Sequence, residues 1–222
     1  MATASLLPQQ SASVPDGQRF LLRGADWATY RKISDALTRS HVRLTYDRGK
    51  LEFVTISSTH GNYSWLIGRL IATVTEELEL PVKGFSDMTC DREDLERGLE
   101  PDDCFYLANE PLVRNKDSID LAIDPPPDLA VEVDITRNSR TRLSIYAALR
   151  VPEVWRFDGE LLVIHQLQAP GQYIEVERSR YFPFLSGADV VRFLRQRTQM
   201  DENHLVRSFR EWVREQIRAT GK

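Results

Sequence analysis

The strongest constraint on the fold of this chain is a short apolar run that carries two carboxylates. Residues 125–136 read PPPDLAVEVDIT, so three prolines lead into a strand-like segment that contains Glu132 and Asp134. Side chains alternate along a β-strand, and residues two apart therefore share one face. Acids on an apolar strand are costly unless they meet a cation, a metal ion or solvent. The segment therefore predicts a strand whose acidic face has a partner of one of these kinds.

A second acidic segment, EPDDCFYLAN at residues 100–109, opens another predicted strand with Asp102 at its start. If the two strands are neighbours, the carboxylates of Asp102 and Glu132 come together. Carboxylate oxygens are the ligands that a hard divalent ion such as Mg²⁺ prefers. The alternative is that these acids are exposed on an edge strand or paired with arginines.

Hydrophobic periodicity and turn residues predict the remaining elements. Helices are predicted over 26–38, 61–80, 139–149 and 203–218, a hairpin over 42–56, and strands over 82–85, 104–108, 129–135, 153–157, 161–167 and 173–177. The charged residues 90–100 are interpreted as a solvated loop, and residues 1–16 as a disordered tail rich in Ser, Ala, Gln and Pro. The order of elements predicts one α/β domain with a mixed sheet over residues 17–222.

The composition excludes some classes of protein. The formal net charge is −4, so the chain as a whole is not a basic nucleic-acid coat. Five of its 29 basic residues are lysines, which leaves 24 arginines. Because arginine binds phosphate and carboxylate with two parallel hydrogen bonds, local anion sites remain possible.

Two cysteines, Cys90 and Cys104, exclude a disulfide-rich scaffold and a zinc site built on cysteine. The first residues lack the basic segment and apolar run of a signal peptide. No stretch approaches the roughly 20 apolar residues that cross a bilayer. We therefore expect a cytoplasmic protein with no membrane partner.

Three runs in a fixed order, LERGLEPDDCFYLAN, DPPPDLAVEVDIT and IYAALRVPEVWRFDGE, resemble the Uma-type restriction endonucleases, a bacterial family within the PD-(D/E)XK nuclease superfamily. The similarity extends from about residue 42 to about residue 176. It implies a restriction-endonuclease-like core, in which helices flank a central mixed β-sheet with the active site at one edge. It also implies hydrolysis of phosphodiester bonds in DNA with Mg²⁺ or Mn²⁺, and a homodimer with the 203–218 helix as a candidate contact.

The resemblance also implies roles for individual residues. Asp102 matches the aspartate of the "PD" element and Glu132 the acid of the "(D/E)XK" element, so both would ligate the metal, with the Val133 carbonyl as a possible third ligand. His60, in the segment STHGN, matches a position at which family members have histidine, where it would position a water or contact phosphate. The alternative for His60 is a structural histidine at the entry to a helix.

The lysine of the motif is missing, because position 134 is Asp134. In the family, this lysine often lies on the following helix, four residues before a tyrosine. Here Tyr146 keeps the tyrosine position and Arg142 stands in place of the lysine. Arginine cannot be deprotonated in a protein, so Arg142 would bind the phosphate or stabilise its developing charge. Lys83, on an adjacent predicted strand, is an alternative lysine.

Two further arginines, Arg137 and Arg140, lie close to Arg142 in the sequence and are candidates for holding DNA against the acidic site. Salt bridges on a helix surface are the alternative for them. The sequence therefore predicts a metal-dependent DNA endonuclease. A catalytically impaired module of the same fold that binds DNA or protein is the alternative, because Arg142 replaces the lysine. A two-carboxylate glycosidase is disfavoured, because no aromatic-lined groove signature surrounds the acids.

Overall fold

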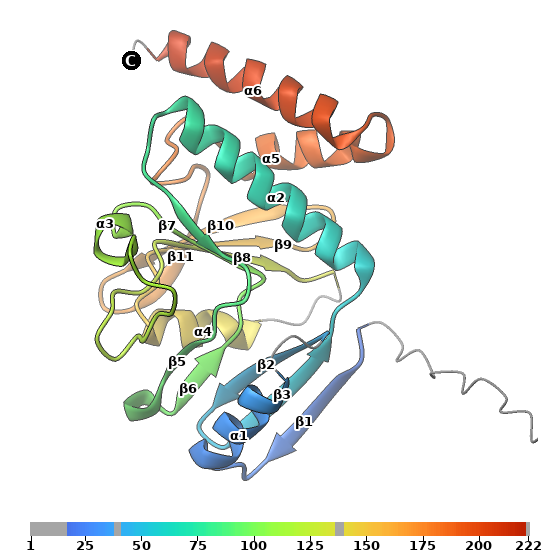
Figure 1. Cartoon of the computed structure of the whole chain (residues 1–222). Coiled ribbons are helices and arrows are strands. Elements are labelled where there is room, and N and C mark those ends of the chain that lie inside the picture. Colours follow the sequence, from blue (N-terminus) through green and yellow to red (C-terminus); the bar gives the residue numbers. More distant parts are fainter. Residues whose placement is uncertain (1–16, 38–40, 136–139, 221–222) are drawn as a thin grey trace, which may run out of the picture.

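The computed structural model describes residues 17–37, 41–135 and 140–220, which form two β-sheets with packed helices (Figure 1). The strands are β1 (Arg19–Arg23), β2 (Val42–Asp47), β3 (Lys50–Thr55), β4 (Lys83–Phe85), β5 (Cys90–Arg92), β6 (Arg97–Leu99), β7 (Asp103–Tyr106), β8 (Leu129–Val133), β9 (Glu153–Phe157), β10 (Leu162–Gln168) and β11 (Gln172–Val176). The helices are α1 (Trp27–Leu37), α2 (Ser58–Glu77), α3 (Glu110–Val113), α4 (Arg140–Ala148), α5 (Gly187–Leu194) and α6 (Glu202–Ala219), with short 3-10 turns at Glu93–Leu95 and Arg195–Thr198. Within these described residues, no helix has both the length and the apolar character needed to cross a bilayer.

The larger sheet is mixed, with the strand order β11-β10-β9-β8-β7-β4. Strands β8 and β9 are parallel, and the other neighbours are antiparallel. Helices α2, α5 and α6 cover one face and α4 covers the other (Figure 1). Strand β8 is buried along its whole length, as expected for a strand with helices on both sides.

Alternation along β8 decides which way its acid points. Leu129, Val131 and Val133 belong to the core under α2, α5 and α6, whereas Ala130 belongs to the core under α4. Period-two geometry therefore turns Glu132 toward α4 as well. The larger sheet thus places a carboxylate against a helix instead of solvent.

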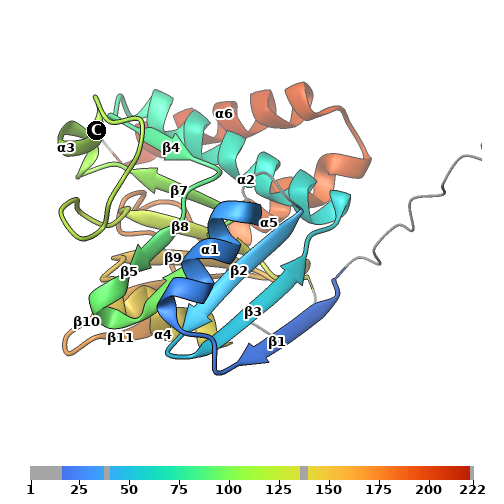
Figure 2. The ribbon, with the colours of Figure 1, turned by 60° about the horizontal axis from the view of Figure 1, so that its bottom comes forward.

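The smaller sheet is antiparallel throughout, with the order β1-β3-β2-β6-β5 and α1 packed against it (Figure 2). Strands β2 and β3 form a hairpin with a two-residue turn, in which Arg48 and Gly49 have φ angles of 46° and 84°. The rings of Tyr30 on α1 and Tyr46 on β2 stack with centroids 4.9 Å apart. The chain passes from β6 to β7 through residues 100–102, so this short segment joins the two sheets.

The predicted mixed sheet with flanking helices is confirmed, as are the hairpin and most of the predicted helices and strands. Helix α2 begins at Ser58, before the predicted start, because Ser57 caps it. Strand β1 and helices α3 and α5 were not predicted. The predicted tail over 1–16 lies outside the described residues.

The interpretation of residues 90–100 as a solvated loop is wrong. This segment contains β5 and β6, and β6 pairs with β2. Cys90 and Leu99 are fully buried, while the acids between them form the 3-10 turn. Each strand has only three residues, of which one is apolar, so neither strand shows a period in the sequence.

Candidate active site

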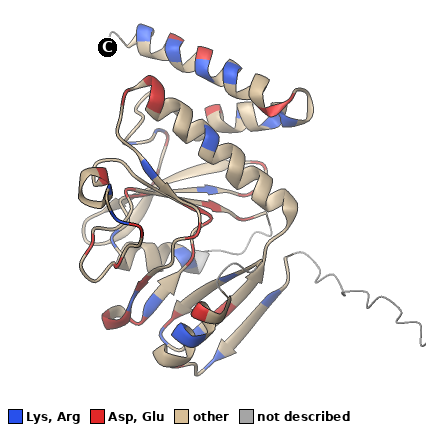
Figure 3. Ribbon diagram, in the orientation of Figure 1, with Lys and Arg blue, Asp and Glu red and all other residues tan. Residues whose placement is uncertain are grey.

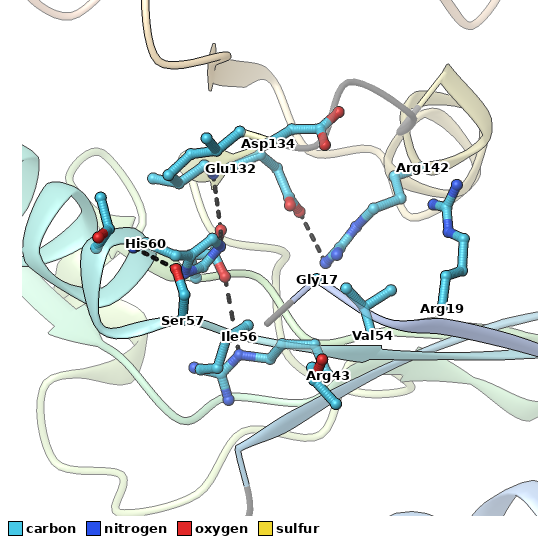
Figure 4. A pocket seen from close by; sticks show the side chains of 15 residues that line it. Gly17, Arg19, Arg43, Val54, Ile56, Ser57, His60, Glu132, Asp134 and Arg142 are labelled. Carbon is cyan, nitrogen blue, oxygen red and sulfur yellow. Dashed lines mark hydrogen bonds and ion pairs between the residues drawn. The ribbon is translucent and has the colours of Figure 1, made fainter. Parts of the chain in front are cut away.

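A cavity of about 340 Å³ lies where the two sheets meet (Figure 4). Its wall holds five side chains that the sequence singled out, which are those of His60, Asp102, Glu132, Asp134 and Arg142. These side chains come from α2, the segment before β7, β8 with the residue that follows it, and α4. Arg43 on β2 also lines the cavity, and no motif in the sequence marked it.

Glu132 is buried, with 4% of its surface exposed. Arg142 and Tyr146 lie four residues apart on α4 and therefore share a face. The Tyr146 hydroxyl donates to Oε1 of Glu132, and Nη2 of Arg142 lies 2.9 Å from the same oxygen. Burial raises the pKa of Glu132 to about 7, against the opposing charge of Arg142 and with a further upward contribution from Asp102. A substantial fraction of Glu132 is thus protonated near neutral pH.

Asp102 is also buried, with 5% of its surface exposed. Its Oδ2 accepts a hydrogen bond of 2.7 Å from the Val133 N–H and lies 3.1 Å from Nε2 of His60. Burial alone would raise the pKa of Asp102, but the bond to His60 and the surrounding positive charges outweigh it and hold this pKa low. Asp102 is therefore the ionised member of the acid pair.

His60 lies in the first turn of α2, where its backbone N–H donates to the Ser57 hydroxyl at 3.1 Å. The capping group is Ser57, which leaves the imidazole of His60 free to turn toward Asp102. Burial lowers the pKa of His60, but the hydrogen bond and the charge of Asp102 more than compensate, so the net direction is upward. The imidazole therefore holds a proton more readily than a free histidine does.

Arg142 also donates to the Glu100 carbonyl at 2.5 Å, so its guanidinium connects two strand ends. Arg43 lies with Nε 3.8 Å from Oδ1 of Asp102, too far for a hydrogen bond. Among the described residues, Nε of Arg43, Nε of Arg142 and Nδ1 of His60 are buried without a hydrogen-bond partner. Buried polar groups are normally paired, and these three nitrogens each have a hydrogen-bonding position open to a ligand atom, as do Nε of Arg156 and Nε2 of His165 outside the cavity.

Asp134 follows β8 and forms an ion pair of 2.9 Å with Arg156 on β9. Both Asp134 and Val133 line the cavity, although this ion pair engages Asp134. Arg137 lies outside the described residues, as does the side chain of Arg140.

Lys83, the alternative lysine, takes no part in the site. Its ammonium group donates to the carbonyls of Val113, Arg114 and Lys116, where it holds the chain after α3. The suggestion that Lys83 replaces the missing motif lysine is therefore wrong.

Helix α6 packs against α2, and its charges are interspersed along its length (Figure 3). Arg210 and Arg214 bind Glu77 at 2.7 Å each, so these two arginines are engaged within the chain. The apolar side chains Leu205 and Phe209 are buried in the core under α2. The apolar face of α6 is therefore used within the chain, and a dimer contact through the 203–218 helix stays a prediction.

The donor chemistry fits the predicted Mg²⁺ or Mn²⁺ ion. In the described part of the chain, neither Oδ1 of Asp102 nor Oε2 of Glu132 accepts a hydrogen bond, although Nε of Arg43 lies 3.8 Å from the former. The described residues contain no group of three His, Cys, Asp or Glu side chains suited to a metal ion. Mg²⁺ commonly binds to one or two carboxylates and takes its other ligands from water and substrate phosphate. Asp102 and Glu132 supply the two carboxylates that such a site needs.

Comparisons with known proteins agree with the resemblance seen in the sequence. The model of the Uma2 family, described as "Putative restriction endonuclease", matches residues 27–199. A crystal structure of "a putative nuclease belonging to DUF820" from Anabaena variabilis is similar, with 13% identity, a TM-score of 0.46, and coverage of 67% of this chain and 89% of that one. No curated protein matches the chain. With most of its length matched by the family model, this chain belongs to the Uma2 family of nucleases.

Proposed function

We propose that this protein is a divalent-metal-dependent DNA endonuclease that hydrolyses phosphodiester bonds in the 340 Å³ cavity. One observation carries the proposal: two buried carboxylates share this cavity with three buried nitrogens that lack a partner among the described residues. The free carboxylate oxygens suit a cation, and the unpaired nitrogens suit the oxygens of an anion. A phosphodiester with a bound divalent cation satisfies both requirements at once.

Asp102, Glu132 and the Val133 carbonyl would hold the metal ion. A bound Mg²⁺ or Mn²⁺ supplies a Lewis acid for the phosphoryl group and lowers the pKa of water. Because protonated Glu132 is a poor ligand, binding must displace its proton, and the charge of Arg142 favours that loss. Tyr146 donates to Glu132 and fixes the orientation of the carboxylate.

Arg142 and Arg43 contact the phosphate in this proposal. Their buried Nε–H groups supply hydrogen bonds to its non-bridging oxygens and stabilise the negative charge that develops during attack. Arg142 stays charged throughout, because a guanidinium keeps its proton. His60 holds its proton through the contact with Asp102 and presents Nδ1 to the substrate.

Nicking of supercoiled plasmid tests the proposal. Wild-type protein with Mn²⁺ should nick the plasmid, whereas Asp102→Asn, Glu132→Gln and wild type with excess chelator should not. Calorimetric titration of Mn²⁺ in parallel should show binding that depends on Glu132. Equal nicking by wild type and Glu132→Gln would overturn the assignment of the site.

A second function is favoured by the ion pair between Arg142 and Glu132, which already neutralises one proposed metal ligand. On this alternative the protein binds DNA or another protein without cutting. Arg142→Lys separates the two functions: nicking that appears only in this variant would identify the natural protein as a binding module.

We also propose that the protein acts as a homodimer, since two copies of one site would cut both strands of a duplex. The buried apolar face of α6 implies that any such contact uses another surface. Analytical ultracentrifugation at micromolar protein concentration measures whether the protein is a monomer or a dimer. A monomer both with and without duplex DNA would contradict the proposal.

A further inference from the structure

A second cavity, of about 490 Å³, adjoins the candidate active site. The two cavities share Arg43, His60 and Asp102 in their walls. Beyond these shared residues, the second cavity is lined by one side of α2, including Trp65, by Asp103 and Phe105 on β7, and by the two residues that follow β4. A ligand with its phosphate at Asp102 therefore has room to extend along α2.

Trp65 is the most unusual side chain in this second wall. Its surface is 59% exposed, although large aromatic side chains are usually buried. Its indole N–H nevertheless donates to Oε2 of Glu202 at 3.0 Å. Arg69 lies 5.9 Å from the centre of the ring and itself binds Glu202 at 3.3 Å. The edge of the ring is thus held in place while much of its surface remains open.

The turn of α2 at Gly61 leaves open space, whereas a Cβ at Gly68 would lie 3.1 Å from Oδ2 of Asp103. Gly61, Gly68 and Ala72 line the same cavity. A Cβ added at Gly61 would meet no atom within 4 Å, so this part of the wall is open. A flat ligand can therefore approach Trp65 without displacing a neighbouring side chain at Gly61.

We propose that the second cavity binds the base of the nucleotide adjacent to the scissile phosphate, stacked on Trp65. The inference rests on the proposed function, because Asp102 must lie at the phosphate. A base is joined to its phosphate through a single sugar, so a base whose phosphate lies at Asp102 extends in this proposal into the adjoining cavity that Trp65 lines. Aromatic side chains that are fixed in advance bind bases at little entropic cost, and stacking tolerates any base.

This subsite also narrows the substrate class. A base paired within a duplex cannot enter a cavity in the protein unless it leaves the stack. The proposed substrate is therefore DNA with an unpaired nucleotide next to the cleaved bond, such as a single strand or a duplex opened at that nucleotide.

Binding of labelled oligonucleotides to the full chain, in chelator so that no cutting occurs, tests the subsite. Trp65→Ala should weaken binding of a single-stranded oligonucleotide about 5- to 100-fold, the range found for loss of one stacked base. Trp65→Phe should retain most of the affinity but lose the quenching of tryptophan fluorescence that the oligonucleotide causes in wild type. Ile123→Ala, which alters an 80% exposed apolar side chain outside both cavities, is the matched control and should bind like wild type.

The outcomes separate this subsite from the function on which it rests. Wild-type protein that neither binds DNA nor nicks plasmid would overturn both. Wild-type binding and nicking with unchanged affinity in Trp65→Ala would overturn the subsite alone. Equal weakening for a blunt duplex and for a single strand would overturn the assignment to an unpaired nucleotide. A loss confined to unpaired DNA would support it.

Discussion

Nη2 of Arg142 lies 2.9 Å from Oε1 of Glu132, so a permanent positive charge sits beside one proposed metal ligand. The same guanidinium donates to the Glu100 carbonyl, which ties α4 to the segment before β7. Both contacts are made by the same nitrogen, Nη2, so one end of the guanidinium holds the carboxylate and the carbonyl together. Arg142 therefore combines a structural role with a charge that the proposed reaction uses.

Replacement of Arg142 should distinguish these two roles. We expect Arg142→Lys to retain nicking within about tenfold of wild type, because the charge remains near Glu132. Arg142→Met should lower nicking by about 10²- to 10³-fold, the usual effect of removing one donor to a developing negative charge. Steady-state nicking rates measure both, and full activity of Arg142→Met would remove the guanidinium from the mechanism.

Asp102→Asn should abolish Mn²⁺ binding and nicking while the protein stays folded. An asparagine oxygen still accepts the Val133 N–H, so the local backbone is retained. Calorimetry measures the loss of binding, and circular dichroism checks the fold. Glu211→Gln, at an exposed position on α6, is the matched control and should behave like wild type.

The pKa of Glu132 predicts a particular dependence of stability on pH. Its folded-state pKa of about 7 exceeds the value of 4.5 for a free glutamate, so the folded state binds the additional proton between these two values. The free energy of unfolding of wild type should therefore fall, relative to Glu132→Gln, as pH rises from about 4.5 to about 7, by up to about 3 kcal/mol. Urea unfolding of both proteins at pH 5 and pH 8 measures the difference. The prediction would be contradicted if the free energy of unfolding of wild type, relative to that of Glu132→Gln, were higher at pH 8 than at pH 5.

Tyr146→Phe removes the hydroxyl that donates to Glu132. We expect the pKa of Glu132 to rise further, because the carboxylate loses a hydrogen bond to its charged form. Mn²⁺ affinity at pH 7 should consequently fall several-fold, and stability should fall by about 1–3 kcal/mol. Calorimetric titrations with Mn²⁺ at pH 7 and pH 8.5 test whether the raised pKa of Glu132 causes this loss of affinity. At the higher pH Glu132 is ionised in both proteins, so much of the affinity should return.

Lys83→Met should lower stability and leave nicking unchanged. The ammonium group of Lys83 holds backbone carbonyls after α3, and hydrogen bonds from a charged donor contribute about 1.5–3 kcal/mol. Urea unfolding measures the loss, and plasmid nicking below the unfolding transition measures the activity. Loss of nicking in a folded Lys83→Met protein would reopen the question of a catalytic lysine.

Most of the fold could be predicted from the sequence because its long elements repeat apolar residues with a clear period. The turn at Arg48 and Gly49 also stands out, since glycine accepts a positive φ angle. Strands β5 and β6 could not be predicted, because these three-residue segments have no period of their own and are stabilised by the pairing of β6 with β2 and of β5 with β6. Helix α5 had a usable signal, the reciprocal cap between Ser186 and Asp189.

The acids of the candidate site could be predicted because a carboxylate in an apolar strand is conspicuous. Arg43 could not, since an arginine on a hairpin strand usually faces solvent and only the arrangement of the two sheets brings it to the cavity. The pairing of Asp134 with Arg156 was equally hidden, because it depends on the parallel register of β8 and β9.

The position of the cavity between the two sheets has a consequence for synthesis of the protein. Its residues enter the growing chain in the order Arg43, His60, Asp102, Glu132 and Arg142, each from a different segment. The hairpin and α2 are therefore translated well before the strand and the helix that complete the acid pair. During synthesis, the basic side chain of Arg43 is therefore present before Glu132 and Arg142 have been added. The proposed hydrolytic activity arises only after α4 has been synthesised and has packed against the sheet.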